Sequence, residues 1–308
     1  MNIRTLGLTA AAVVSTLAIG LMQTGSAYAV TIAYSGYPPS QSAFWGSVSE
    51  AAKAEAAKEG ITLLDITTPE ADAAAQKDAI DTAINQKVDG IIIGAIDNRA
   101  FDDTLAKAKA AGIPVVAIDT GIDNPWVKSL IQTDNLAAAK VAGQYIVDHA
   151  TKGTVLIVGG SEGHQTGNAR RDGVIAAVTP AGFKVIFQIC DWKADCAYDQ
   201  TLTQTKSNPD ITAVFAAWDG GALAAENAVK ENGKVANIVV VGFDGSPANF
   251  DSIKAGEQAA TMKQDSAQMG TAGVQNVVAL INGKAPPALI PIPGILIDKS
   301  NVDSYIGK

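Results

Sequence analysis

The sequence has few of the side chains that hold metal ions. Among its 308 residues there are only two cysteines, Cys190 and Cys196, and only two histidines, His149 and His164. A zinc site needs more ligands than this cysteine pair and two distant histidines offer. No oxygen-rich loop of the EF-hand type is evident either. We therefore predict neither a metal site nor a cofactor.

Positive charge is also scarce. Lys and Arg total 23 against 31 Asp and Glu, which gives a formal net charge of −8. Nucleic acids and anionic lipid surfaces are bound through basic patches. The acidic balance therefore argues against a nucleic acid or an anionic membrane surface as the partner.

Motifs for catalysis are absent or incomplete. Gly159-Gly-Ser-Glu-Gly163 follows a predicted strand, but it lacks the full dinucleotide fingerprint, and no Walker-type Lys-Ser/Thr follows it. There is no Gly-x-Ser-x-Gly elbow, and His164 has no recognisable Ser or Cys partner. Paired carboxylates leave an exported glycoside hydrolase as an alternative. The same acids can bind hydroxyl groups, so we predict that the protein is not an enzyme.

Long apolar runs are confined to the N-terminus. Arg4 supplies a positive start, residues 6–22 an apolar core, and Ala27-Tyr28-Ala29 a small-residue cleavage site. This is the pattern of a secretory signal peptide. A membrane anchor is disfavoured, because Thr and Gly interrupt the apolar core and no stop-transfer flank follows. We predict that residues 1–29 are a signal peptide cleaved near Ala29, and that the protein is periplasmic, since no later segment could span a bilayer.

The two cysteines lie six residues apart in Cys190-Asp-Trp-Lys-Ala-Asp-Cys196. Disulfides persist in the oxidising compartment to which the signal directs the chain. We therefore predict a local Cys190–Cys196 bridge, with two free buried thiols as the alternative.

Strand-like and helix-like segments alternate along the mature chain, which is typical of an α/β fold with mostly parallel sheets flanked by helices. One sheet would need more than ten strands, an unusual number, so two similar units joined by short crossings fit better. The predicted strands are 30–35, 61–67, 90–95, 114–119, 129–133, 154–159, 184–190, 213–217, 238–243, 259–263 and 295–298. The predicted helices are 43–59, 72–86, 101–111, 135–149, 168–178, 197–207, 222–231, 249–255 and 266–281, with a Pro-rich stretch before the last strand.

An acid follows one of the most apolar strands. The run Ile238–Val241 ends in Gly242-Phe243-Asp244-Gly245, and Ser246-Pro247 then opens a helix. Open α/β sheets bind ligands in the crevice outside the carboxyl ends of their strands. Asp244 is therefore a candidate ligand contact, although it could instead cap the following helix. Asp219 could likewise cap the helix that begins beside it.

The order of elements and the residues at the strand ends resemble the type I periplasmic sugar-binding proteins of the ribose-binding kind. The resemblance covers essentially the whole mature chain. It implies two α/β lobes with three hinge crossings and a ligand in the cleft between them. It places lobe one at about 30–132 plus 265–293, and lobe two at about 133–264 plus 294–308.

The resemblance also implies a set of ligand-binding residues. An aromatic pair after the first strand, a strand-end acid, an Arg preceding a Gly by three and a Gln after a later strand all match the family's pattern. Trp192 could instead only cover the disulfide loop, and Phe44 or Trp45 could belong to the lobe core. The matching positions are Phe44, Trp45, Asp119, Arg170, Trp192, Trp218, Asp244 and Gln264.

Three positions depart from the ribose-binding pattern. Thr120 stands where the family carries Arg after the strand-end Asp, Trp218 where it carries Asn, and Ser42 where an Asn precedes the aromatic pair. Two polar recognition groups are thus weakened or lost and one aromatic face is gained. We therefore expect a sugar or polyol other than ribose, whose hydroxyls meet charged groups and whose C–H faces meet aromatic rings.

The function that the resemblance implies is ligand capture for transport. Closure of the two lobes on a small sugar or polyol would present the protein to an inner-membrane ABC permease. A sensor that delivers its ligand-bound form to a membrane chemoreceptor or kinase is the alternative.

Overall fold

The computed structural model describes residues 29–40, 42–161 and 163–307. Residues 1–28 of the predicted signal peptide lie outside this part. No helix within the described residues is long and apolar enough to cross a membrane.

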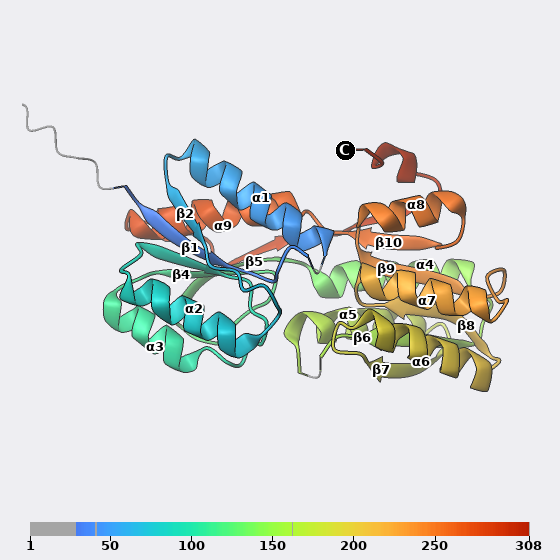
Figure 1. The fold of residues 1–308 in the computed structure, drawn as a ribbon. Coiled ribbons are helices and arrows are strands. Elements are labelled where there is room, and N and C mark those ends of the chain that lie inside the picture. The colour runs from blue at the N-terminus through green and yellow to red at the C-terminus, as the bar shows by residue number, and fades with distance from the viewer. Residues whose placement is uncertain (1–28, 41, 162, 308) are drawn as a thin grey trace, which may run out of the picture.

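The chain folds into two α/β lobes that lie side by side (Figure 1). One lobe holds the strands β1 to β5 and β11, and the other holds β6 to β10 and β12. The elements up to the first crossing are β1 (Thr31–Ser35), α1 (Ala43–Lys58), β2 (Thr62–Asp65), α2 (Ala73–Asn85), β3 (Gly90–Ile93), α3 (Asp102–Ala111), β4 (Val115–Ile118) and β5 (Val127–Thr133). The next are α4 (Asn135–His149), β6 (Thr154–Gly159), α5 (Gln165–Val178), β7 (Lys184–Ile189), α6 (Ala194–Ser207), β8 (Ile211–Ala216), α7 (Asp219–Glu231), β9 (Val239–Asp244), α8 (Pro247–Ala255) and β10 (Ala260–Lys263). The chain ends with α9 (Ser266–Ile281), β11 (Leu289–Ile292), β12 (Ile295–Asp298) and a short 3₁₀ turn at Val302–Ser304.

The two sheets have the same strand order. The first runs β11-β5-β4-β3-β1-β2 and the second β12-β10-β9-β8-β6-β7. All pairs are parallel except β10 with β12. The predicted α/β class with mostly parallel sheets is thus confirmed. The chain passes between the sheets after β5, after β10 and after β11, and the limits assigned above to each lobe stay a prediction.

The central strands are buried on both faces, as their apolar runs predict. Every residue of β3, β4 and β6 is buried. One large apolar cluster fills most of the second lobe and a small one lies between α8 and β12, while two clusters cover opposite faces of the first sheet. Both sheets are therefore packed on each face, and side chains at their carboxyl ends extend from a buried framework.

The structure differs from the sequence-based expectation at several element boundaries. Strand β11 was not predicted, because Pro291 lies within it. Pro cannot donate to a ladder, but β11 is an edge strand that pairs only with β5, where Pro is tolerated. Helices α5, α6 and α7 each begin three residues earlier than predicted, and in α7 those residues include two glycines, which are poor helix formers.

Candidate functional site

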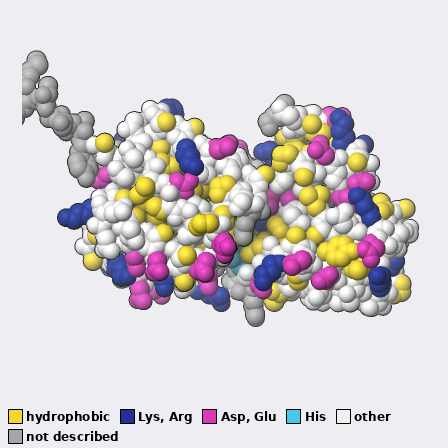
Figure 2. Space-filling model, in the orientation of Figure 1, with side chains coloured by type: hydrophobic (Ala, Val, Ile, Leu, Met, Phe, Trp, Pro, Cys, Tyr) yellow, Lys and Arg dark blue, Asp and Glu magenta, His cyan; other side chains and the backbone are white. Residues whose placement is uncertain are grey.

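A pocket of about 170 Å³ lies between the lobes, and its lining comes from both of them. Figure 2 shows the notch that separates the two halves of the molecule. All eight residues expected from the resemblance line this pocket, and four further residues join them. The full lining is Tyr37, Ser42, Phe44, Trp45, Asp119, His164, Thr166, Arg170, Trp192, Trp218, Asp244 and Gln264.

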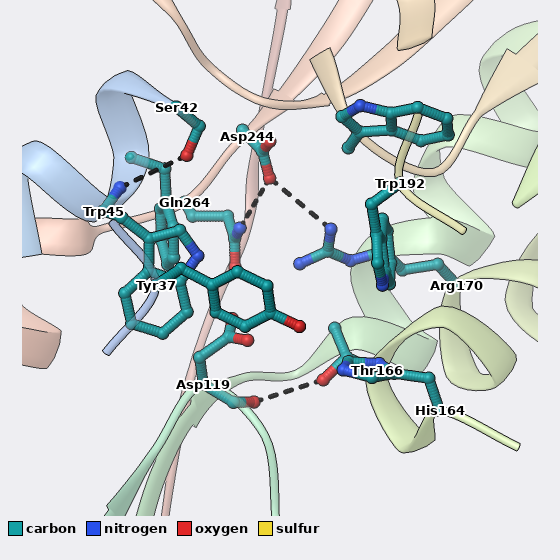
Figure 3. Close-up of a pocket in the computed structure, with 12 residues that line it drawn as sticks. Tyr37, Ser42, Trp45, Asp119, His164, Thr166, Arg170, Trp192, Asp244 and Gln264 are labelled. Carbon is teal, nitrogen blue, oxygen red and sulfur yellow. Dashed lines mark hydrogen bonds and ion pairs between the residues drawn. The ribbon is translucent and has the colours of Figure 1, made fainter. Parts of the chain in front are cut away.

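Asp244 closes β9 and lies at the centre of a polar network (Figure 3). Its Oδ1 accepts hydrogen bonds from Gln264 Nε2 at 2.8 Å and Arg170 Nη1 at 3.4 Å. Its Oδ2 accepts one from the backbone N–H of Asp219 at 3.4 Å. Burial, with a smaller contribution from the nearby Asp219, raises the pKa of Asp244 to about 7 against the lowering effect of Arg170. Its backbone φ of 136° is unusual for a residue with a side chain, so the fold holds this carboxylate in place.

Asp219 and Asp244 each bind the N-terminus of the other's adjacent helix: Asp219 binds α8 and Asp244 binds α7. Asp219 does not cap α7, whose N-cap residue Trp218 makes no side-chain capping bond. The Asp219 carboxylate instead accepts from the backbone N–H of Ser246, the N-cap of α8, at 2.6 Å. Asp244 in turn binds the first N–H of α7. The two capping alternatives are therefore wrong for the helices they named. Both carboxylates lie at helix N-termini, where the positive end of the dipole favours negative charge.

Gln264 joins this network to a crossing between the lobes. It follows β10, whose register sets Lys263 beside Asp244. Its Oε1 accepts from the Thr133 hydroxyl at 2.6 Å, while its Nε2 donates to Asp244. Thr133 ends β5, at the first crossing between the sheets. The amide thus joins the pocket to the crossings after β5 and after β10, which would bend if one lobe moved against the other.

Arg170 is the buried cation of the site, with 3% of its surface exposed. Its Nε donates to Asn135 Oδ1 at 2.8 Å, and its Nη1 donates to the carbonyl of Ala217 at 2.7 Å. The guanidinium also lies 3.9 Å from the centre of the Phe243 ring. The neighbouring Arg171 instead pairs with Asp172 nearer the surface. These contacts fix the guanidinium plane in the pocket wall, and Asp244 offsets its charge.

Asp119 is the acid of the first lobe, directly after β4. Its Oδ2 accepts from the Thr120 hydroxyl at 2.9 Å, and its φ is 62°. The Thr120 hydroxyl also lies 3.1 Å from the hydroxyl of Thr166 in the other lobe. Burial raises the pKa of Asp119, while Arg170 across the pocket lowers it. Thr120, at the position where the family carries Arg, thus connects the two walls instead of adding a cation.

Tyr37, Phe44 and Trp45 form the aromatic wall of the first lobe. Trp45 stacks on Tyr37 with ring centroids 5.2 Å apart, and Phe44 meets its edge at 5.3 Å. The Trp45 ring lies against Gly94, where any side chain would overlap it. Ser42 caps α1 by accepting from the Trp45 backbone N–H. The helix start and the glycine together hold this indole against the pocket.

Trp192 and Trp218 form the aromatic wall of the second lobe, edge to face with centroids 5.7 Å apart. The predicted Cys190–Cys196 disulfide is present and closes the loop that carries Trp192. Asp191 and Trp192 both have left-handed backbone conformations, with φ of 48° and 59°. The Trp192 indole rests on Gly160, where any side chain would overlap it. The covalent loop and the glycine thus turn this indole toward the cleft.

His164 and Thr166, at the start of α5, are pocket residues that sequence reasoning missed, and Tyr37 is a third. A signal was present in each case, because ligands of open α/β sheets bind outside the carboxyl ends of the strands. Tyr37 lies just after β1, and His164 and Thr166 lie in the segment after β6. No group of three or more acids, cysteines or histidines suited to a metal ion occurs in the described ranges.

Two α/β lobes with identical strand order, enclosing a pocket of charged and aromatic side chains at their strand ends, define a two-lobed ligand-binding protein. The sequence model of one protein family, the periplasmic binding protein domain, matches residues 32–285. The chain therefore belongs to that family.

Named relatives agree with this assignment. The chain is 29% identical to the D-allose-binding periplasmic protein of Escherichia coli K12, over 87% of this chain and 91% of that protein. It is 30% identical to a ribose import binding protein of Salmonella typhimurium, over 83% and 86%. A solved ABC transporter solute-binding protein from Agrobacterium vitis, bound with α-D-tagatopyranose, superposes with a TM-score of 0.84 at 27% identity, over 90% and 99% of the chains.

Proposed function

We propose that this chain is a periplasmic solute-binding protein of an ABC importer, and that it captures a monosaccharide or polyol between its lobes. One observation carries the proposal. The pocket sets two strand-end carboxylates and a buried guanidinium between aromatic walls that come from both lobes. The relatives named above, which bind or import sugars by their names, support the same class.

The chemistry of the lining suits a polyhydroxylated ring or chain. Hydroxyls around its edge can donate to Asp119 and Asp244 and accept from Arg170. The C–H faces can pack on the indoles of Trp45 and Trp192. A site whose buried polar groups expect hydroxyl partners rejects ligands that lack them, because those groups would stay unpaired.

The size of the pocket limits the ligand. The pocket has a volume of about 170 Å³. It is below the range of ordinary drug-sized sites. A single sugar or a linear polyol fits this limit, and an oligosaccharide does not.

The residues that differ from the ribose-binding pattern lie in or beside the pocket. Thr120 bonds to Asp119 and Thr166, and Trp218 adds an apolar face where the pattern has an amide. We propose that the ligand presents fewer hydroxyl groups than ribose does toward Thr120 and Trp218. Asp119 and Asp244 serve in binding, and the protein has no catalytic role.

The ligand joins the lobes, because its polar partners come from both. Such a ligand shifts the population toward the closed form, which a permease can recognise. A sensor role through a chemoreceptor stays a prediction from the sequence.

Isothermal titration of the mature chain with D-ribose, D-allose, D-tagatose, D-xylose, xylitol and myo-inositol tests the proposal. We expect one of these compounds to bind in the micromolar range or tighter. Binding of amino acids, with none of these compounds bound, would refute the sugar assignment.

A further inference from the structure

His164 lines the pocket, but the proposed function assigns it no contact with the ligand. It is the N-cap residue of α5, and 5% of its surface is exposed. Its Nδ1 accepts a hydrogen bond from the backbone N–H of Gly167 at 3.4 Å. A nitrogen that accepts carries no proton, so the proton of the neutral ring belongs to Nε2.

That Nε2–H has no hydrogen-bond partner among the described residues, and it is fully buried from solvent. Buried N–H groups are nearly always paired, and leaving one unpaired costs free energy. The ring borders the pocket and meets the edge of Trp192 at 5.1 Å. Figure 3 shows it directed toward Thr166 and the interior of the pocket.

The surroundings keep the ring neutral. Burial lowers the pKa of His164 to about 4, and the positive charge of Arg170 lowers it as well, against the opposing effect of Asp97. At neutral pH the residue is therefore a donor at Nε2 without a full charge. Trp192 Nε1 is a second buried donor with no hydrogen-bond partner among the described residues.

We propose that His164 is a specificity-determining residue, whose Nε2–H donates to an oxygen of the bound sugar or polyol. This rests on the proposed function and deepens it. Asp119 and Asp244 accept hydrogen bonds from ligand hydroxyls, whereas the Nε2–H of His164 requires a hydrogen-bond acceptor at its own position. The pocket therefore selects a hydroxyl, ring or carbonyl oxygen there, and excludes an ammonium group such as that of an amino sugar.

The first test needs no ligand. Long-range ¹H–¹⁵N NMR spectra of the two histidines report which ring nitrogen carries the proton. His149 is the internal comparison, since its Nδ1 lies 2.8 Å from the carbonyl of Tyr145, which can only accept. We expect opposite tautomers, with His164 in the Nε2–H form from pH 5.5 to 8. A protonated Nδ1 on His164, or a charged ring at pH 7, overturns the inference.

The second test uses a variant that keeps the helix cap. In His164→Asn the amide oxygen can accept from Gly167, since Asn is a good N-cap residue, but the donor at Nε2 is lost. We expect the titration compound that binds the wild type most tightly to bind this variant about 3- to 10-fold more weakly, the effect of one neutral hydrogen bond. His149→Asn, on the exposed end of α4, is the control and should not change affinity.

The outcomes separate the two proposals. Equal affinity of His164→Asn and wild type overturns the role of His164 and leaves the sugar-binding function intact. If none of the six compounds binds the wild type, the proposed ligand class fails, and the tautomer of His164 still decides whether the pocket holds a free donor.

Discussion

The two sheets share one strand order, yet the acids that follow their corresponding strands are held in different ways. Asp119 comes after β4 and Asp244 ends β9, the same place in each order. Asp244 is bound by Arg170, Gln264 and a helix N–H, all from its own lobe or its edge. Within the described part of the chain, the side chain of Asp119 accepts one hydrogen bond, from Thr120, whose hydroxyl also lies 3.1 Å from that of Thr166 in the other lobe. The acid of the second lobe is thus held by three groups, while the acid of the first lobe is bonded to its chain neighbour and lies against the other lobe.

Contacts across the cleft support this contrast. The Gln165 amide oxygen accepts from the backbone N–H of Gly121 at 2.9 Å, and Thr166 donates to the carbonyl of Asp119 at 3.3 Å. Both partners in the first lobe adjoin its acid. The lobes therefore meet at the segment of Asp119.

Replacing Asp244 should have the largest effect. Asp244→Ala removes the acceptor for ligand hydroxyls and leaves Arg170 buried without its charged partner. We expect binding of the tightest sugar or polyol to weaken by about 2 kcal/mol or more, measured by titration calorimetry. Asp251→Ala, an exposed acid in α8, is the matched control. Wild-type affinity in Asp244→Ala contradicts its place in the site.

Replacing Asp119 tests the comparison itself. Asp119→Ala leaves no buried cation unpaired, because Arg170 keeps Asp244. The expected loss of binding is about 1 kcal/mol. A loss as large as that of Asp244→Ala would show that the two walls contribute equally, and the contrast drawn between them would be wrong.

The disulfide loop offers a smaller test, directed at the second wall. In Cys190→Ser/Cys196→Ser the left-handed backbone at Asp191 and Trp192 is no longer held, and such conformations cost roughly 1 kcal/mol per residue. We expect affinity for the ligand to fall about fivefold, because Trp192 loses its fixed position. Denaturant unfolding of the same variant separates this from a general loss of stability. Unchanged affinity would make the bridge a structural clip only.

The last test concerns the pH dependence of stability rather than ligand affinity. Asp244 has a folded-state pKa of about 7 against an ordinary value of 3.8. Between these values the folded chain binds more protons than the unfolded chain, so the free energy of unfolding falls as the pH rises. Asp244→Asn should flatten this fall, with a remainder from Asp219, whose pKa burial raises to about 6. Urea unfolding at pH 4, 5.5 and 7 measures it, and an unaltered slope would mean that Asp244 titrates as an ordinary acid.

Much of the fold could be predicted because it is written in local patterns. Buried parallel strands appear as continuous apolar runs, and Asp244 follows one of them directly. Strand β11 was missed because Pro291 argues against a strand unless its place at the sheet edge is known. The starts of α5 and α7 were missed because His164 and a distant carboxylate serve those helix ends.

The pocket, too, has residues that the sequence could predict and residues that it could not. The resemblance identified eight lining residues, since they follow recognisable strand ends. It could not identify the partners that hold them. The indoles of Trp45 and Trp192 rest on Gly94 and Gly160, and nothing in the local sequence connects each pair.

By itself the sequence determined the two α/β units, the acidic surface and the presence of acids and aromatics after the strands. Each of these depends on neighbours a few residues away, through periodicity, charge and chain direction. Only the tertiary structure decided which partners hold these side chains and which further residues join them in the pocket. Arg170 meets Asp244 across 74 residues, and Thr133 meets Gln264 across 131. Such pairs form because strands and helices that are distant in the chain pack beside one another, which brings their ends together.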